Sequence, residues 1–152
     1  QVVRVQISPE LAVNARRRIA HRRSGNLQLL EAPAETAPIE GAFDGALMFG
    51  APDVYASPAA LANVLPHLRS GARVVFFGAK TSRRRFGWIL NPLLRAIFPK
   101  ISFPSTPVPN DAPWSVLAPD LRDLTVEEYF FGWMFLAAGT ATDRLLSLSD
   151  DR

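Results

Sequence analysis

Residues 43–79 read FDGALMFGAPDVYASPAALANVLPHLRSGARVVFFGA, and this stretch decides the fold class. It begins with an apolar run from Phe43 to Phe49 and ends with another from Arg73 to Ala79, both typical of short buried strands. Between them, Ser57 to Leu68 carries a proline in its first turn, which predicts a helix that Ser70-Gly71 closes. A strand–helix–strand unit predicts parallel strands in an α/β sheet.

The preceding residues predict the same alternation once more. Residues 2–7 are rich in valine, as a buried strand is, and Ser8-Pro9-Glu10 is typical of a helix start, so we expect a helix to about Arg23. Leu27 to Leu30 predicts a short strand, followed by a loop through Pro38. Repeated alternation of strands and helices predicts a doubly wound, mostly parallel sheet.

The pattern changes after Lys80. Residues 80–113 combine basic and bulky apolar residues with a proline-rich stretch, and we interpret them as a lid. Two apolar runs follow, Leu124 to Tyr129 and Trp133 to Ala138, which predict a closing antiparallel pair of strands. The sequence therefore predicts one α/β domain over residues 1–139 and a polar tail over residues 140–152.

The composition excludes several kinds of site. The 152 residues contain no cysteine and only two histidines, which excludes disulfides and thiolate sites and argues against a metal centre. No run approaches the roughly 20 apolar residues of a membrane-spanning helix, so a cytoplasmic location is expected. Gln1 leads directly into a strand, and we interpret this as a trimmed N-terminus that lacks an upstream element.

The order of these segments resembles a known family. The segments are VVRVQISPE at 2–10, EAPAETAPI at 31–39, GAFDGAL at 41–47, RSGARVVFF at 69–77 and VEEYFFGWMFLAAG at 126–139. Together they resemble class I S-adenosylmethionine-dependent methyltransferases, and within them the ubiquinone/menaquinone-biosynthesis and phosphatidylethanolamine N-methyltransferase-like branch. The resemblance covers about residues 1–139. It implies a Rossmann-like sheet with a closing antiparallel hairpin, in which the first strand and glycine-rich loop of the family are absent.

The resemblance also implies which positions face S-adenosylmethionine. The cofactor-binding positions would be Gln6, Ile7, Ala34, Glu35, Phe49 and Gly50. Gln6 stands where the family places an acid for the ribose hydroxyls, and Pro33 stands where it often has an aspartate that reads adenine. Losing one charge-assisted hydrogen bond lowers affinity about ten- to a hundredfold. We therefore expect weak or absent cofactor binding by this chain.

Three residues are candidates for the substrate side. Asp53 and Tyr55 follow the fourth strand of the family pattern, at the sheet edge where open α/β sheets bind ligands. They either contact substrate or are ordinary loop residues. Trp88 lies in the predicted lid. The resemblance implies methyl transfer to a small or lipid-like acceptor.

The charge distribution suggests a partner. Between Asp53 and Asp111 there is no acidic residue, whereas Arg83, Arg84 and Arg85 precede a body of phenylalanine, tryptophan, isoleucine and leucine. Such a segment is either a lid packed on the sheet or an element that contacts an anionic membrane peripherally. Nucleic acid is a weaker interpretation, because no nucleic-acid-binding motif accompanies the basic residues.

Two functions compete with methyl transfer. One is a non-catalytic relative or fragment that binds membrane or protein through its basic lid. The other is a nicotinamide-dependent enzyme on a similar sheet, although the predicted closing hairpin favours the methyltransferase.

Overall fold

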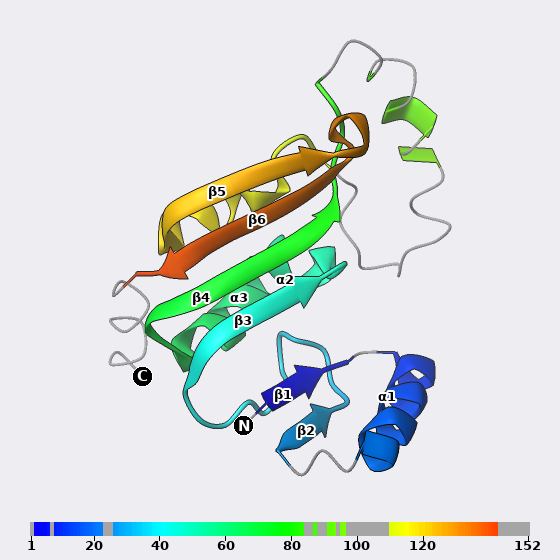
Figure 1. Ribbon diagram of the computed structural model, residues 1–152, viewed down its shortest axis with the longest axis vertical. Coiled ribbons are helices and arrows are strands. Elements are labelled where there is room, and N and C mark those ends of the chain that lie inside the picture. The colour runs from blue at the N-terminus through cyan, green and yellow to red at the C-terminus, as the bar shows by residue number, and fades with distance from the viewer. Residues whose placement is uncertain are drawn as a thin grey trace.

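The computed structural model describes residues 2–6, 8–22, 26–83, 87, 91–93, 95–96 and 110–142. Its helices and strands are β1 (Val2–Val5), α1 (Pro9–Arg22), β2 (Leu27–Leu30), β3 (Phe43–Phe49), α2 (Pro52–Tyr55), α3 (Pro58–Val64), β4 (Leu68–Ala79), β5 (Leu121–Tyr129) and β6 (Met134–Ala141). Short 3-10 turns are η1 (Leu65–His67), η2 (Pro113–Ser115), η3 (Ala118–Asp120) and η4 (Phe130–Gly132). Figure 1 shows their arrangement.

The strands form two sheets. β1 and β2 pair parallel in a two-stranded sheet, and the other four strands have the order β3-β4-β6-β5 (Figure 1). β3 and β4 pair parallel, whereas β6 pairs antiparallel with both β4 and β5. The predicted α/β class is confirmed, and the larger sheet is mixed.

The predicted helix over residues 57–68 is too long. Ser57 caps α3 as expected, since its hydroxyl oxygen accepts a hydrogen bond of 3.2 Å from the backbone N–H of Ala60. The α-helix ends at Val64, because Pro66 has no N–H with which to continue the helical hydrogen bonds. Leu68 already belongs to β4, and Gly71 (φ +79°) lies in a bulge of that strand rather than at a helix end.

Other predicted bounds also shift. The first strand ends at Val5 rather than at residue 7, and β5 begins at Leu121, three residues earlier than predicted. β6 continues to Ala141, beyond the predicted domain end at residue 139. The short helix α2 was not predicted, although Pro52 and Asp53 are common in a first helical turn. Most of the predicted lid and residues 143–152 of the tail lie outside the described residues.

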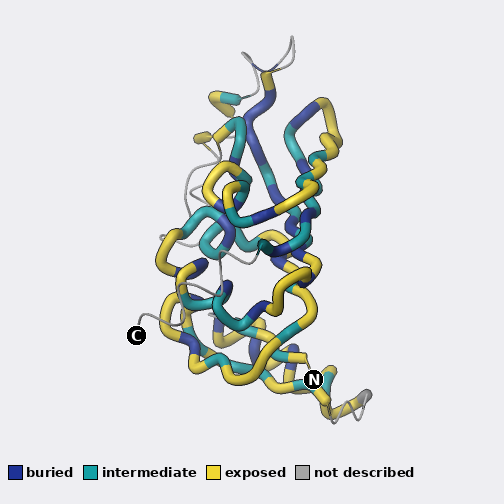
Figure 2. The backbone as a smooth tube through the Cα atoms, turned by 90° about the vertical axis from the view of Figure 1, so that its left-hand side faces the viewer, coloured by how far each residue is buried: buried dark blue, intermediate teal, exposed yellow. Residues whose placement is uncertain are grey.

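The core lies between the four-stranded sheet and the helices that cover one of its faces. Tyr55 of α2 and Phe135 of β6 are in ring contact at 5.7 Å, and Phe76 of β4 contacts both, at 5.7 and 5.8 Å. Leu61 of α3 belongs to the same buried cluster. Buried and partly buried positions alternate along β6 and the carboxyl half of β4, as expected for strands with one face on the core. Figure 2 shows the burial of each position along the backbone.

Gly78 of β4 is required by this packing. A Cβ atom at Gly78 would collide with the hydroxyl oxygen of Tyr55, so no larger residue fits without moving the ring. The close approach of strand and ring fixes α2 against the carboxyl end of β4.

Candidate functional site

A large cavity lies between β1 and β3. Its volume is about 1260 Å³, and residues from β1, β3, α2 and the carboxyl end of β4 line it. β1 and β3 point the same way (Figure 1), so their carboxyl ends meet at one end of the cavity. In open α/β sheets this is the edge where ligands bind.

Most of the predicted site residues line this cavity. They are Gln6, Ala34, Phe49, Gly50, Asp53 and Tyr55. Glu35 is close enough for its charge to act on Asp53. Ile7 and Trp88 lie outside the described residues. The structure thus brings together positions that are far apart in the sequence, and their individual contacts with a ligand remain predictions.

The carboxyl end of β3 turns sharply into the cavity. Gly50 adopts φ +61°, a left-handed conformation that disfavours other residues, and its N–H donates a 2.9 Å hydrogen bond to the carbonyl of Phe77. A Cβ on Gly50 would have no heavy atom within 4 Å. Before the turn, Phe49 is 71% exposed and stacks on Phe77 at 4.6 Å. The backbone at Gly50 is therefore open to a ligand from the cavity.

Asp53 has perturbed acidity. Burial raises the pKa of its carboxyl group above the usual value of 3.8 and outweighs the backbone hydrogen bond, which acts in the opposite direction. The negative charge of Glu35 adds to the rise in the pKa of Asp53. Two carboxylates beside an apolar cavity favour a positively charged ligand.

Tyr55 occupies a different environment from Asp53. It is only 1% exposed and belongs to the aromatic core, although it also borders the cavity. Burial raises the pKa of its hydroxyl group well above the usual value of 10.0. The structure gives Tyr55 a packing role, and contact with a substrate stays a prediction.

The loop after β2 is held by a residue that the sequence did not point to. The side-chain amide of Asn63, on α3, donates hydrogen bonds to the carbonyl oxygens of Ala34 (2.8 Å) and Ala37 (3.0 Å). These bonds connect residues that are 26 and 29 positions apart. No local sequence pattern predicts such a contact. The two hydrogen bonds hold the loop that contains Ala34 and Glu35.

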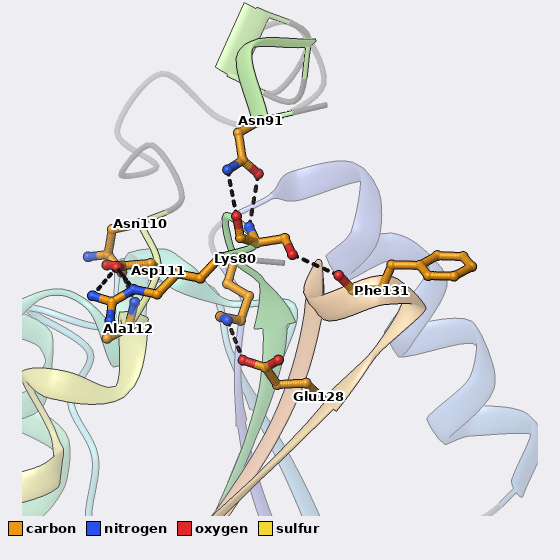
Figure 3. Close-up of polar contacts among 9 residues, drawn as sticks. Lys80, Asn91, Asn110, Asp111, Ala112, Glu128 and Phe131 are labelled. Carbon is orange, nitrogen blue, oxygen red and sulfur yellow. Dashed lines mark hydrogen bonds and ion pairs between the residues drawn. The ribbon is translucent and has the colours of Figure 1, made fainter. Parts of the chain in front are cut away.

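A buried ion pair lies at the carboxyl end of β4 (Figure 3). The ammonium of Lys80, whose side chain is 3% exposed, lies 2.5 Å from the carboxylate of Glu128 on β5. The same ammonium stands 5.5 Å from the centre of the Trp114 ring. The pair joins Lys80, the first residue of the predicted lid, to β5.

Arg83 is the predicted membrane-contact arginine that the structure describes. Its guanidinium pairs with Asp111 and lowers the pKa of that carboxyl group. The side chain of Arg83 is 82% exposed. Arg84 and Arg85 lie outside the described residues.

The described residues hold no group of three or more side chains suited to a metal ion. Among the helices in this part of the chain, none is long and apolar enough to cross a membrane.

Several solved structures share the architecture of this chain. The N-methyltransferase NodS from Bradyrhizobium japonicum WM9, in complex with S-adenosyl-l-homocysteine, matches with a TM-score of 0.63 at 12% identity, over 93% of this chain and 66% of NodS. YcgJ from Bacillus subtilis matches with a TM-score of 0.65 at 12% identity, over 92% of this chain and 82% of YcgJ. The S-adenosylmethionine-dependent methyltransferase SibL gives 0.61 at 19% identity, over 93% of this chain and 43% of SibL.

The chain has a methyltransferase fold. No protein-family profile and no curated protein matches its sequence. At these identities the likeness concerns the fold, and the chain spans less than half the length of SibL.

The raised pKa of Asp53 predicts a pH-dependent effect of Asp53→Asn. The folded state takes up a proton on Asp53 more readily than the unfolded chain, so the charged carboxylate opposes folding at neutral pH. This cost is lost as the pH falls through the folded pKa towards 3.8. We expect Asp53→Asn to raise the free energy of unfolding in urea at pH 7, by an amount that shrinks in acid.

Glu35→Gln is the matched control for this effect, since it removes only the smaller contribution to the pKa of Asp53 and should stabilise less. An Asp53→Asn variant that is less stable than the parent at every pH would contradict the assignment.

The buried ion pair predicts unequal effects of its two partners. Glu128→Leu leaves the ammonium of Lys80 buried without its carboxylate and should cost about 3–5 kcal/mol of unfolding free energy. Lys80→Met keeps the apolar stem, and the carboxylate of Glu128 is 32% exposed and can be hydrated, so its cost should be small. Urea unfolding at neutral pH measures both.

The double variant Lys80→Met/Glu128→Leu should be more stable than Glu128→Leu alone, because the buried charge is gone. If Lys80→Met proves the more damaging single change, the ion pair is not what Lys80 contributes.

Proposed function

We propose that this chain carries the cofactor half of an S-adenosylmethionine-dependent methyltransferase. The observation that carries the proposal is the convergence of Gln6, Ala34, Phe49, Gly50 and Asp53 on one cavity at the carboxyl ends of β1 and β3. The resemblance to methyltransferases implies cofactor contacts for Gln6, Ala34, Phe49 and Gly50, and Asp53 is a candidate for the substrate side. NodS, which shares the fold, binds S-adenosyl-l-homocysteine, and this supports the same class of cofactor here.

The residues present fit such a cofactor in part. The open backbone at Gly50 permits close approach, and Phe49 offers an apolar wall. The carboxylates of Asp53 and Glu35 favour the positive charge of a sulfonium. Gln6 is less suited to a ribose than an acid, since its amide oxygen already lies 3.5 Å from the guanidinium of Arg4. We infer that this chain binds the cofactor weakly.

Methyl transfer from S-adenosylmethionine needs mainly correct positioning of the two reactants by the protein. Bound in the cavity lined by Gln6, Phe49 and Gly50, S-adenosylmethionine would supply an activated methyl group on a positively charged sulfur for transfer to the acceptor. This reaction depends on holding the acceptor in line with the methyl group and on excluding water. Gly50, Phe49 and the loop fixed by Asn63 shape the cavity, and Asp53 is placed to attract a cationic group.

The strand edges beside the cavity leave room for a further strand. Within the described residues, β1 pairs only with β2 and β3 only with β4, so the edges facing the cavity have no ladder partner. The cavity exceeds the roughly 300–1,000 Å³ that small-molecule sites usually need. Leu47 on β3 is 72% exposed. A further parallel strand between β1 and β3, followed by a glycine-rich turn, would join the two sheets and complete the cofactor site.

The acceptor that fits best is small or lipid-like, as the resemblance to the ubiquinone/menaquinone and phosphatidylethanolamine branch implies. The basic segment at Arg83, Arg84 and Arg85 supports peripheral contact with an anionic membrane near such an acceptor. The competing proposal is a non-catalytic relative that binds membrane or protein through the same segment. Gln6 and Pro33 favour it, because both weaken cofactor binding.

Calorimetric titration with S-adenosylhomocysteine tests the proposal. The 152-residue chain should bind weakly or undetectably, and a longer form that begins upstream of Gln1 should bind with micromolar affinity. In the longer form, Gly50→Val should abolish binding, because it strains the backbone and fills the open side of the turn. Ala59→Val, at an exposed position of α3, is the control.

If the longer form does not bind the cofactor, the methyltransferase proposal fails and the non-catalytic alternative stands.

A further inference from the structure

The turn between β5 and β6 presents aromatic rings to solvent. Phe130 is 72% exposed and Phe131 is 77% exposed, and Tyr129 before them is 41% exposed. Phenylalanine is usually buried, and an exposed adjacent pair at the tip of a strand connection is a feature that core packing does not explain.

The backbone of this turn is held in a strained conformation. Phe130 (φ +50°) and Phe131 (φ +59°) both lie in the left-handed region, which is sterically costly for bulky residues. Gly132 follows with φ +85°. Strain of this kind persists only where the surroundings impose it, and it is common at binding sites.

A buried network imposes the conformation (Figure 3). The hydroxyl of Ser82, which is 5% exposed, donates a 2.7 Å hydrogen bond to the carbonyl of Phe131. Asn91 fixes Ser82 in turn, accepting from its N–H (2.9 Å) and donating to its carbonyl (2.8 Å). The N–H of Lys80 donates to the carbonyl of Trp133 at 2.8 Å. The ring of Phe131 points away from this network, so the network orders the turn and leaves the ring outside.

Most of the charged groups described around the turn are paired with one another. Nearby carboxylates are engaged within the protein: Glu128 with Lys80, Glu127 with the hydroxyl of Tyr129, and Asp111 with Arg83. The segment that Asn91 begins adds Leu93, which is 53% exposed, and the exposed Arg95. This end of the molecule therefore shows phenyl rings together with the exposed guanidinium groups of Arg83 and Arg95, while the exposed carboxylate of Glu127 keeps its negative charge.

We propose that Phe130 and Phe131 insert into the interface of an anionic lipid bilayer. Two exposed aromatic rings on a hydrogen-bonded turn, with the exposed Arg83 and Arg95 on the segment that contacts it, match the chemistry of such an interface, where rings enter the boundary of the acyl chains and arginines meet the headgroups. Rigid rings also lose little conformational freedom on insertion. The turn lies at the carboxyl end of β4, on the same edge as the cavity, so insertion would direct the cavity towards the membrane. This last step rests on the proposed methyl transfer; the insertion does not.

Co-sedimentation with vesicles tests the insertion. The full 152-residue chain should bind vesicles of phosphatidylcholine mixed with phosphatidylglycerol, and Phe130→Asn/Phe131→Asn should lower the partition coefficient about tenfold or more. Asparagine tolerates the left-handed region, so this variant should unfold at the same temperature as the parent or higher. Leu11→Asn/Val13→Asn, which changes exposed apolar residues on α1, is the matched control and should bind like the parent.

Arg83→Gln should weaken binding to the anionic vesicles and leave weak binding to phosphatidylcholine alone unchanged. Equal partitioning of the parent and Phe130→Asn/Phe131→Asn would overturn the proposal, and so would a parent that binds neither vesicle, which would favour a protein partner for the turn. S-adenosylhomocysteine binding is measured separately, so failure of insertion and failure of the methyltransferase proposal are distinguishable.

Discussion

The contact of Tyr55 with Phe76 and Phe135 is the interaction on which the arrangement of the cavity depends. It joins α2 to β4 and β6 through rings 5.7 to 5.8 Å apart, and Gly78 leaves room for the Tyr55 hydroxyl. Because Tyr55 is buried in this core, the one-turn helix α2 stays close to the carboxyl end of β3, from which only Gly50 and Ala51 separate it. That position brings Asp53 to the cavity and forces the sharp turn at Gly50. A packing interaction thus sets the geometry of the candidate site.

Local patterns predicted the strands well and the site contacts poorly. The bounds of β2 and β3 follow from their apolar runs. Six of the residues predicted for the site line the cavity, and their contacts with a ligand stay predictions. The end of α3 was missed, although Pro66 marks it. Asn63 and the Lys80–Glu128 pair were missed for a deeper reason: their partners are 26 to 48 positions away, and periodicity carries no information about such contacts.

The strand edges beside the cavity favour a further strand, whereas the carboxyl ends of the strands favour a ligand. Among the described residues, the edges of β1 and β3 that face the cavity have no strand partner, and unpaired backbone groups at such edges favour another strand. At the carboxyl ends, the open backbone of Gly50 and the carboxylate of Asp53 favour a cationic ligand. The proposed function accounts for both features, because a further strand and turn beside β1 and β3 would complete the proposed cofactor site.

The most direct test of this account is to map, by amide chemical shifts, where S-adenosylhomocysteine binds in a form extended upstream of Gln1. The account predicts the largest shifts at Gln6, Glu35 and Gly50, around the carboxyl ends of β1 and β3, with smaller effects along α1. Shifts concentrated away from the cavity, for example at the β5–β6 turn, would contradict it.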